Sequence, residues 1–353
     1  MGLSMSIATH NKGNMKGSLW KRSIPGVRIV STGMFAPDNE VRNEDLAELG
    51  YDSDWIIQRT GIKSRRHVQN HQATSDMATQ AARMCLENAN VDPNEIDLII
   101  IATMTPDHYT PSAACLTQAN LGCRNAAALD LNAACSGFVY SLATAGNFIT
   151  AGNCQKALVV GAETMSMVVD PRDKKTFPLF GDAAGAVLLE ADPKPDDAQA
   201  SGLLTYRLAS VGEMSDCLVV PAGGSRMPLC QDVLDTRSQY LRMDGRTVFK
   251  WAVRLVPEIT REMLDAVNLK LEDIDWFIYH QANKRIIYSV ADELGVDLDK
   301  VIINLERYGN TSAASIPITL HEGNTAGRFK RGDLIAIAGF GAGLTWAASV
   351  LRW

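Results

Sequence analysis

The fold of this chain is decided by a stretch that occurs twice. Residues 90–101 read NVDPNEIDLIII, and residues 268–279, which begin 178 positions later, read NLKLEDIDWFIY. In each copy a polar segment that ends in Ile-Asp leads into four apolar residues. Continuous apolar runs of this length are typical of strands that are buried on both faces. The two stretches therefore predict equivalent strands in two copies of one α/β unit.

The match between the copies continues along the chain. Apolar runs at 157–160 and 334–337 form a second pair of predicted strands, and each run leads to a glycine. Helical patterns alternate with these runs, as expected for α/β layers. We therefore expect an N-terminal extension over residues 1–24, a first half over 25–205 and a second half over 206–353. The halves should be related by a pseudo-two-fold axis.

Composition excludes several classes of protein. The formal net charge is −6, and no basic stripe suits a nucleic-acid partner. No run approaches the ~20 apolar residues of a membrane span. The first residues lack the apolar core of a signal peptide, which predicts a cytoplasmic protein. The seven cysteines form no C-x-x-C pair, so we expect neither a zinc site nor a disulfide framework.

The segment LDLNAACSGF, residues 129–138, is the strongest candidate for chemistry. Apolar residues recur at helical spacing after Cys135, so a buried helix should begin at this cysteine. A thiol there faces unpaired backbone N–H groups and the positive end of the helix dipole. Both should lower its pKa and make it a nucleophile, although a structural cysteine is also compatible with this segment alone.

Two further polar residues occupy comparable places. His280 directly follows the strand at 276–279, and Asn310 lies between a predicted strand and a helix. Alone, the histidine is compatible with a packed core and the asparagine with a helix N-cap. Because ligands gather at the carboxyl ends of strands in open α/β sheets, all three residues should meet in one cleft.

The chain resembles β-ketoacyl-acyl carrier protein synthase III, of the thiolase-like superfamily. The resemblance covers about residues 24 to 353. It rests on several motifs in order: WIIQRTGI at 55–62, the Cys135 segment, FGDAAGA at 180–186, HQAN at 280–283, GNTSAAS at 309–315 and GAGLTW at 341–346. It implies a thiolase-like fold, with two related α/β halves stacked in αβαβα layers.

The resemblance also implies a reaction. Cys135 would be acylated by a coenzyme A thioester, and malonyl-acyl carrier protein would then lose CO2 and condense with the acyl group. Fatty acid synthesis would begin with this decarboxylative Claisen condensation. His280 and Asn310 would donate hydrogen bonds to the thioester oxygen of the malonyl group. Backbone N–H groups at Cys135 and Ala342 would hold the other oxyanion. No cofactor is implied beyond these thioester substrates, and no metal, flavin or nicotinamide site is indicated.

Further residues are assigned only by this resemblance. The coenzyme A and pantetheine contacts would be Trp55, Arg59, Gly245, Arg246, Phe249 and Asn283. The carrier-protein contacts would be Lys250, Gln281, Ala282, Asn283, Lys284 and Arg285. Met167 stands where some members have an arginine, so binding of the coenzyme A nucleotide is expected to be weaker. Asp292-Glu293 stands where relatives often have lysines, so binding of the carrier protein is also expected to be weaker. The remaining histidines, His67, His71, His108 and His321, are interpreted as surface or packing residues.

The acyl pocket is the last assignment. Thr110 stands where relatives restricted to short primers can have phenylalanine, in a loop that crosses the interface of a homodimer. We therefore expect a homodimer that accepts primers longer than acetyl.

Three other readings remain open. A Cys-His-Asn order also occurs in papain-like hydrolases, but their cysteine lies near the mature N-terminus in a C-G-[SA]-C-[WY] context that this chain lacks. An inactive relative that acts as a binding partner would not need all three polar residues. A secondary-metabolite synthase or acyltransferase of the same superfamily would share them.

Overall fold

The computed structural model describes residues 23–50, 52–69, 72–192 and 201–353. The N-terminal extension expected over 1–24 lies outside this part of the chain except for its last two residues, and His71 also lies outside it. Within the described ranges, no helix combines the length and the apolar character that crossing a membrane requires.

The first sheet has five strands in the order β2-β8-β7-β5-β6. The middle strand β7 pairs in parallel with β5 and antiparallel with β8, and β6 forms one edge. The strands are β2 (Val27–Phe35), β5 (Leu98–Ala102), β6 (Ala127–Leu131), β7 (Lys156–Thr164) and β8 (Asp182–Ala191).

The second sheet has the order β1-β9-β14-β13-β12. Its strand β13 pairs in parallel with β12 and antiparallel with β14, as β7 does with β5 and β8. The strands are β1 (Ile24–Pro25), β9 (Gly202–Ser210), β12 (Trp276–Tyr279), β13 (Leu334–Gly341) and β14 (Thr345–Arg352).

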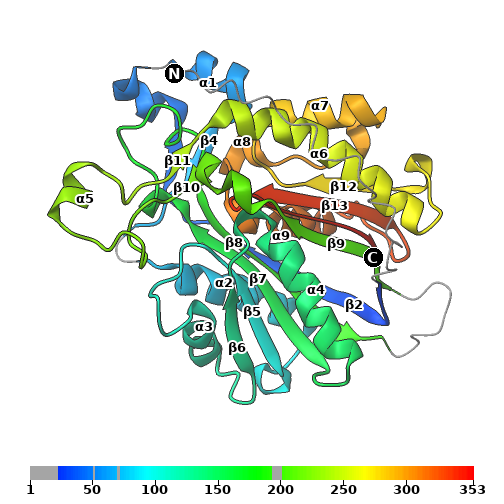
Figure 1. The fold of residues 1–353 in the computed structure, drawn as a ribbon. Helices are drawn as coiled ribbons and strands as arrows, with labels where there is room; N and C mark the ends of the chain where they lie inside the picture. Colours follow the sequence, from blue (N-terminus) through cyan, green and yellow to red (C-terminus); the bar gives the residue numbers. More distant parts are fainter. Residues whose placement is uncertain (1–22, 51, 70–71, 193–200) are drawn as a thin grey trace.

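Helices fill three layers around the two sheets (Figure 1). Helices α4 (Gly137–Thr150) and α9 (Ser315–Thr325) pack between the sheets, in a core that both sheets share. Helices α2 (Thr74–Ala89) and α3 (Ala113–Leu121) cover the outer face of the first sheet. Helices α6 (Gly245–Ala266) and α7 (Lys284–Leu294) cover the outer face of the second. The expected αβαβα order is confirmed.

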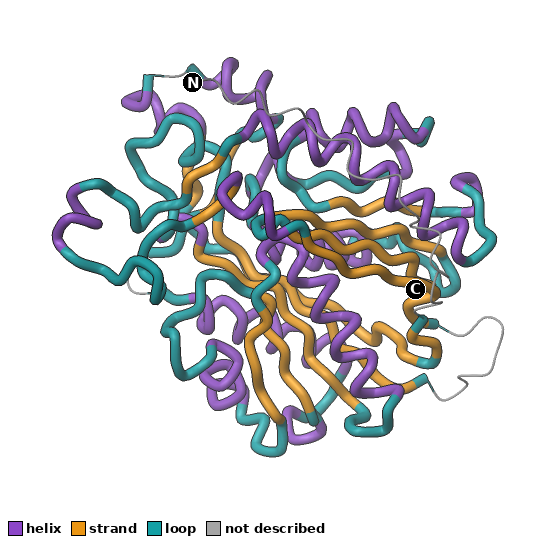
Figure 2. Tube along the Cα trace, in the orientation of Figure 1, coloured by secondary structure: helices purple, strands orange, loops and turns teal. Residues whose placement is uncertain are grey.

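The remaining elements are short and border the layers (Figure 2). They are β3 (Glu40–Arg42), α1 (Ser53–Thr60), β4 (Ser64–Arg66), β10 (Leu218–Val219), α5 (Gln231–Asp235), β11 (Arg242–Met243) and α8 (Leu305–Tyr308), with 3-10 turns that include η3 (Ala134–Ser136) and η8 (Ser312–Ala314).

The pseudo-two-fold relation is visible in the backbone. Leu98 pairs with Ala157 in the first sheet, and Trp276 pairs with Ile335 in the second. Each residue of the second pair lies 178 positions after its counterpart in the first pair. Ala134 and Ser312, also 178 apart, both have a left-handed backbone, with φ of 45° and 49°. The expected boundary between residues 205 and 206 falls within β9, and the division into halves stays a prediction.

Candidate active site

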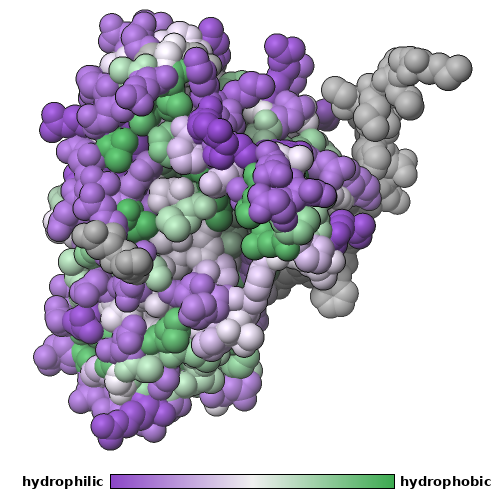
Figure 3. Space-filling view, turned by 90° about the vertical axis from the view of Figure 1, so that its left-hand side faces the viewer, coloured by the Kyte–Doolittle hydropathy of each residue, from purple (hydrophilic) through white to green (hydrophobic). Residues whose placement is uncertain are grey.

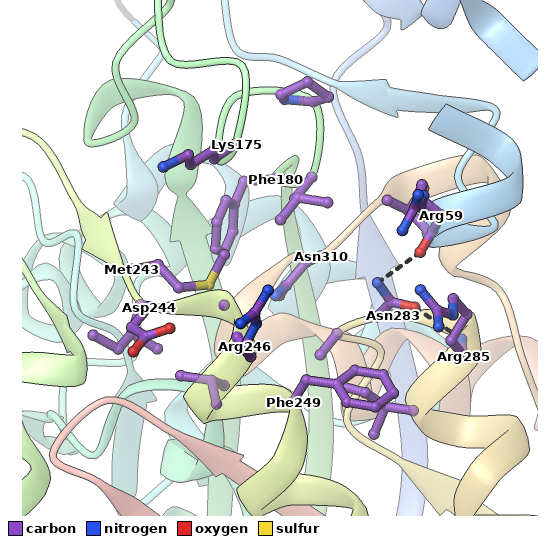
Figure 4. Close-up of a pocket in the computed structure, with 18 of the residues that line it drawn as sticks. Arg59, Lys175, Phe180, Met243, Asp244, Arg246, Phe249, Asn283, Arg285 and Asn310 are labelled. Atoms are coloured by element: carbon purple, nitrogen blue, oxygen red, sulfur yellow. Dashed lines mark hydrogen bonds between the residues drawn. The ribbon is translucent and has the colours of Figure 1, made fainter. Parts of the chain in front are cut away.

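One deep cavity of about 1110 Å³ joins the inner ends of the strands to the surface. Cys135, His280 and Asn310 line its inner part, and Trp55, Arg59 and Arg246 line its mouth. The walls between them are mostly apolar and come from both halves of the chain (Figure 4). They include Leu179, Phe180, Leu218, Met243, Val248, Phe249 and Phe340. The structure thus brings the three predicted polar residues together.

Cys135 lies in η3, directly before α4, as the helical pattern predicted. Only 6% of the residue is exposed, and its Sγ lies 3.4 Å from the Oγ of Ser312. Burial raises the pKa of the thiol to about 12, and the nearby Glu163 acts in the same direction. The bond to Ser312 opposes this shift only in part. The thiol pKa is therefore shifted upward, opposite to the lowered pKa expected from the helix start.

His280 follows β12 and is held rigidly. Its backbone N–H donates to the carbonyl of Ala338, and its Nδ1 lies 2.7 Å from the Oγ of Ser315. Its ring packs against Phe340 in an edge-to-face arrangement, with ring centroids 5.4 Å apart. Burial lowers the imidazole pKa to about 3, so the ring is neutral at physiological pH.

Asn310 enters the cavity from the segment before η8. Its Oδ1 accepts the backbone N–H of Ser312 at 2.9 Å, and this bond fixes the orientation of the amide. The same short turn occurs 178 residues earlier, where Asn132 accepts the N–H of Ala134 at 3.2 Å. Asn132 is exposed, whereas Asn310 is 7% exposed and faces the cavity. Its Nδ2 has no partner among the described residues and remains available as a donor.

Glu163, which none of the sequence motifs identified, lies behind Ser312 at the end of β7. Its carboxylate is fully buried, and burial raises its pKa to about 7. Oε2 accepts from the hydroxyl groups of Thr103 and Thr105 and from the N–H of Met104, while Oε1 accepts from Ser312 at 2.9 Å. An acidic residue directly after a buried apolar run was the signal that could have identified it.

The cavity mouth carries several cationic and aromatic side chains (Figure 4). The guanidinium of Arg59 lies 5.6 Å from the Trp55 ring, and the guanidinium of Arg285 lies 5.5 Å from the Phe249 ring. Asn283 links the α7 side of the mouth to the α1 side, because its Nδ2 donates a hydrogen bond to the carbonyl of Arg59. Lys174 and Lys175 complete the rim, and neither was assigned from the sequence.

The residues assigned to carrier binding divide into two groups. Lys250 and Arg285 are exposed at the mouth, and Lys284 and Ala282 are half-buried beside it. Gln281 is only 1% exposed. Its amide donates to the carbonyls of Tyr279 and Ile302 and accepts the N–H of Asn304. The Gln281 side chain is therefore buried and bonded within the chain in this structure, and its assignment to carrier binding stays a prediction.

The remaining assignments have these positions. Gly245 lines the cavity, and Ala342, next to the lining residue Gly341, is half-buried with its carbonyl accepting from Thr345. Thr110 is exposed and does not line the cavity of this chain. Met167 is 67% exposed.

Of the histidines taken as surface or packing residues, His67 is buried against Phe177, His321 contacts Thr32 and His108 is exposed. Among the described residues, no cluster of three or more His, Cys, Asp or Glu side chains could hold a metal ion.

The fold and the cavity together define a class, the thiolase-like enzymes that carry a cysteine at the inner end of the pocket. Two family models match the chain: 3-oxoacyl-[acyl-carrier-protein] synthase III over residues 129–212, and the C-terminal part of the same family over 264–353.

A β-ketoacyl-[acyl-carrier-protein] synthase III of Rhodopirellula baltica is 52% identical over 94% of this chain and 99% of its own length. The crystal structure of the 3-oxoacyl-[acyl-carrier-protein] synthase III from Aquifex aeolicus is 43% identical, with a TM-score of 0.84 over 93% of this chain and all of its own. The priming β-ketosynthase of the R1128 polyketide pathway is 34% identical, also with a TM-score of 0.84, over 93% and 96%. The chain belongs to the β-ketoacyl-[acyl-carrier-protein] synthase III family of condensing enzymes.

Proposed function

We propose that this enzyme condenses an acyl-coenzyme A primer with malonyl-acyl carrier protein and releases a β-ketoacyl-acyl carrier protein. The single observation that carries the proposal is the shared cavity. Its inner end presents a thiol, a neutral imidazole and a free amide donor, and its mouth presents cations and an indole ring. A long thioester with a charged, aromatic nucleotide end suits such a channel.

In the first half-reaction, the sulfur of Cys135 attacks the thioester carbonyl carbon. An S–C bond forms to Cys135, the bond to the coenzyme A sulfur breaks, and coenzyme A leaves as a thiol after taking up a proton. We assign the developing oxyanion to the backbone N–H groups at Cys135 and Ala342. Because burial disfavours the free thiolate, the Cys135 proton must move to an acceptor as attack begins.

In the second half-reaction, the malonyl group on the carrier loses CO2. The resulting enolate carbon bonds to the acyl carbon, the bond to Cys135 breaks, and the thiol is restored when it regains a proton. Negative charge develops on the malonyl thioester oxygen as CO2 leaves. We assign its stabilisation to the Nδ2 of Asn310 and the Nε2–H of His280.

The hydrogen bonds around His280 support this role. The Oγ of Ser315 accepts the N–H of Gln281 and lies 2.7 Å from the Nδ1 of His280, and we assign the hydroxyl proton of Ser315 to this second contact. In the resulting tautomer the proton of the neutral ring is on Nε2. That atom is therefore a donor toward substrate in our assignment.

The mouth suits an acidic carrier protein. Lys250 and Arg285 are exposed there, and Arg246 lines the same rim. We propose that Lys250 and Arg285 guide the carrier, with Ala282, Asn283 and Lys284 beside them. Asp292-Glu293 at the far end of α7 adds no attraction for such a partner.

We also propose that the enzyme works as a homodimer. Strand β6 lies at a sheet edge and pairs only with β5 in the described part of the chain. Apolar side chains are exposed on the face that carries α5, where green residues lie among purple ones (Figure 3). Leu229, directly before α5, is 62% exposed, and Tyr109, whose hydroxyl bonds to the carbonyl of Gly223, is 85% exposed. A second copy of the chain that covers this face would pair or shield the open edge of β6 and would bury the exposed apolar side chains.

A cytoplasmic location remains part of the proposal. All seven cysteines are free thiols, including the exposed Cys115 and Cys230. Free exposed thiols suit a reducing compartment.

Incubation with a panel of acyl-coenzyme A thioesters, followed by intact-mass measurement, tests the proposed function. We expect a mass increase of one acyl group on Cys135, followed by its loss and β-ketoacyl product when malonyl-acyl carrier protein is added. A Cys135→Ser variant is the control and should accumulate no acyl-cysteine. Hydrolysis of the thioester without condensation would contradict the proposal and favour the hydrolase reading.

A further inference from the structure

Glu163 is a buried carboxylate that the reaction described above does not use. It lies at the end of β7, and Gly341 holds the equivalent place 178 residues later at the end of β13. Gly341 packs directly against Cys135, whereas the side chain of Glu163 reaches Ser312. Thus one copy of the repeat makes room for the nucleophile, and the other places a carboxylate behind it.

A continuous hydrogen-bonded chain connects this carboxylate to the nucleophile. The thiol of Cys135 donates to the Oγ of Ser312 over 3.4 Å, and the Ser312 hydroxyl donates to the Oε1 of Glu163 over 2.9 Å. All three residues are buried, and Ser312 is fully inaccessible. Proton movement along this chain would therefore not pass through bulk water.

The two carboxylate oxygens differ in a way that directs a proton. Oε2 already accepts from Thr103, Thr105 and the N–H of Met104. Oε1 accepts only from Ser312 in the described part of the chain. A proton arriving at Glu163 is therefore best placed on Oε1, where the new O–H can donate back to Ser312.

We propose that Glu163 accepts the proton of Cys135 through the hydroxyl of Ser312 when the nucleophile is activated. The S–H bond of Cys135 breaks as an O–H bond forms on Ser312. The original O–H bond of Ser312 breaks as one forms on Oε1. The negative charge thus moves from Glu163 to the sulfur, and Ser312 now donates to the thiolate. This proposal rests on the proposed function and names the proton acceptor that its first half-reaction needs.

The other titratable groups on the surrounding elements are engaged elsewhere. Asp107 accepts from Ser75, and Asp182 accepts from Ser166 and Val68. The Nδ1 of His280 is bonded to Ser315, and His108 is exposed. No Lys or Arg forms an ion pair with Glu163 within the described ranges. The Cys135 and Glu163 pair should therefore titrate as one coupled unit.

Such a pair has a distinctive pH profile. With one proton on the pair, the proton sits on either sulfur or carboxylate, and a constant fraction is thiolate. Below the Glu163 pKa of about 7 the carboxyl already holds a proton, so the thiol has no acceptor and reactivity falls. At high pH both groups ionise and reactivity rises again. The profile therefore has two limbs with a plateau between them.

The test measures alkylation of Cys135 by iodoacetamide, with peptide mass mapping, from about pH 5 to about pH 10. In the wild-type enzyme, Cys135 reactivity should fall below about pH 7, and this fall is the lower limb of the profile. Glu163→Gln and Ser312→Ala should both lose it. Acylation by acetyl-coenzyme A at neutral pH should fall on the order of 10²-fold in Glu163→Gln, the scale of a lost general base. The double variant should be no slower than the slower single variant.

Asp182→Asn is the matched control, because it also removes a buried carboxylate held by a serine hydroxyl. The Asp182→Asn variant should keep the lower limb of the pH profile. The proposal is overturned by a limb that persists in Glu163→Gln, by unimpaired acylation in that variant, or by loss of the limb in the control. If Glu163→Gln fails to fold, Ser312→Ala decides alone. Failure of wild type to form any acyl-enzyme would instead overturn the proposed function.

Discussion

Gly341 touches Cys135 so closely that no side chain fits between them. A Cβ on Gly341 would lie 2.8 Å from both the Cβ and the backbone N of Cys135, and 3.1 Å from its Sγ. Carbon atoms do not approach a neighbouring backbone that closely, so the residue at 341 must lack a side chain. The end of β13 thereby fixes the position of the nucleophile in the cavity.

The first prediction follows from this contact. Gly341→Ala should displace Cys135 and lower the acylation rate by about 10²-fold, the scale of a misplacement of about 1 Å. The overpacking should also destabilise the fold by roughly 1–3 kcal/mol. Gly212→Ala is the control, because a Cβ there meets no atom within 4 Å. Pre-steady-state acylation and thermal unfolding check both effects, and an unchanged acylation rate would show that Cys135 is positioned otherwise.

The second prediction concerns thiol reactivity. Cys135 should be alkylated by iodoacetamide at neutral pH faster than the other buried thiols, such as Cys85 and Cys123, whose pKa values burial also raises. Acetyl-coenzyme A should protect Cys135 and no other cysteine. The exposed Cys115 and Cys230 provide the internal standard for an unactivated thiol. Modification of these residues with Cys135 left intact would contradict the assignment.

The third prediction separates the two half-reactions. His280→Ala or Asn310→Ala should lower decarboxylation and condensation by about 10²-fold or more, because each removes one donor from the enolate oxygen. Acylation of Cys135 should fall much less, since the sulfur is hydrogen-bonded to Ser312 and the His280 Nδ1 to Ser315, and no hydrogen bond joins either replaced side chain to the sulfur among the described residues. Single-turnover measurements with and without malonyl-acyl carrier protein distinguish the steps. Equal losses in both steps would make His280 the base for Cys135.

Much of this arrangement could be predicted from sequence because it depends on the repeat. The strand at 276–279 placed His280 at one strand end, the segment after the strand at 127–131 placed Cys135 at another, and the structure brings both to one cavity. What the sequence could not show was which way side chains turn and how deeply they are buried. Gln281, next to a cavity residue, turns inward. The Cys135 thiol experiences burial that outweighs its helix-start position, so its pKa shifts the other way.

The fourth prediction concerns the cavity mouth. Arg246→Ala should raise KM for acyl-coenzyme A by a factor of about five with little change in kcat, as expected for an exposed charge that contributes about 1 kcal/mol. The effect should shrink as salt is added, because exposed charges are screened. Lys330→Ala, an exposed cation outside the cavity lining, should leave KM unchanged. A salt-independent change in kcat would place Arg246 in the chemistry instead.

The last prediction concerns primer length and depends on the dimer. Thr110 is exposed on the single chain, in the loop where the hydroxyl of Tyr109 bonds to the carbonyl of Gly223. We expect this loop to reach the acyl channel of the partner subunit, where threonine leaves space that a phenylalanine ring of about 150–250 Å² would fill.

Wild type should therefore accept hexanoyl- and decanoyl-coenzyme A as well as acetyl-coenzyme A, each buried methylene contributing up to ~0.8 kcal/mol. Thr110→Phe should shift preference toward acetyl. Thr325→Phe, at an exposed threonine on α9, is the control and should change no preference. Specificity constants for the three primers in the three proteins decide the question. A wild-type enzyme confined to acetyl, with the same specificity in Thr110→Phe, would show that other residues close the channel.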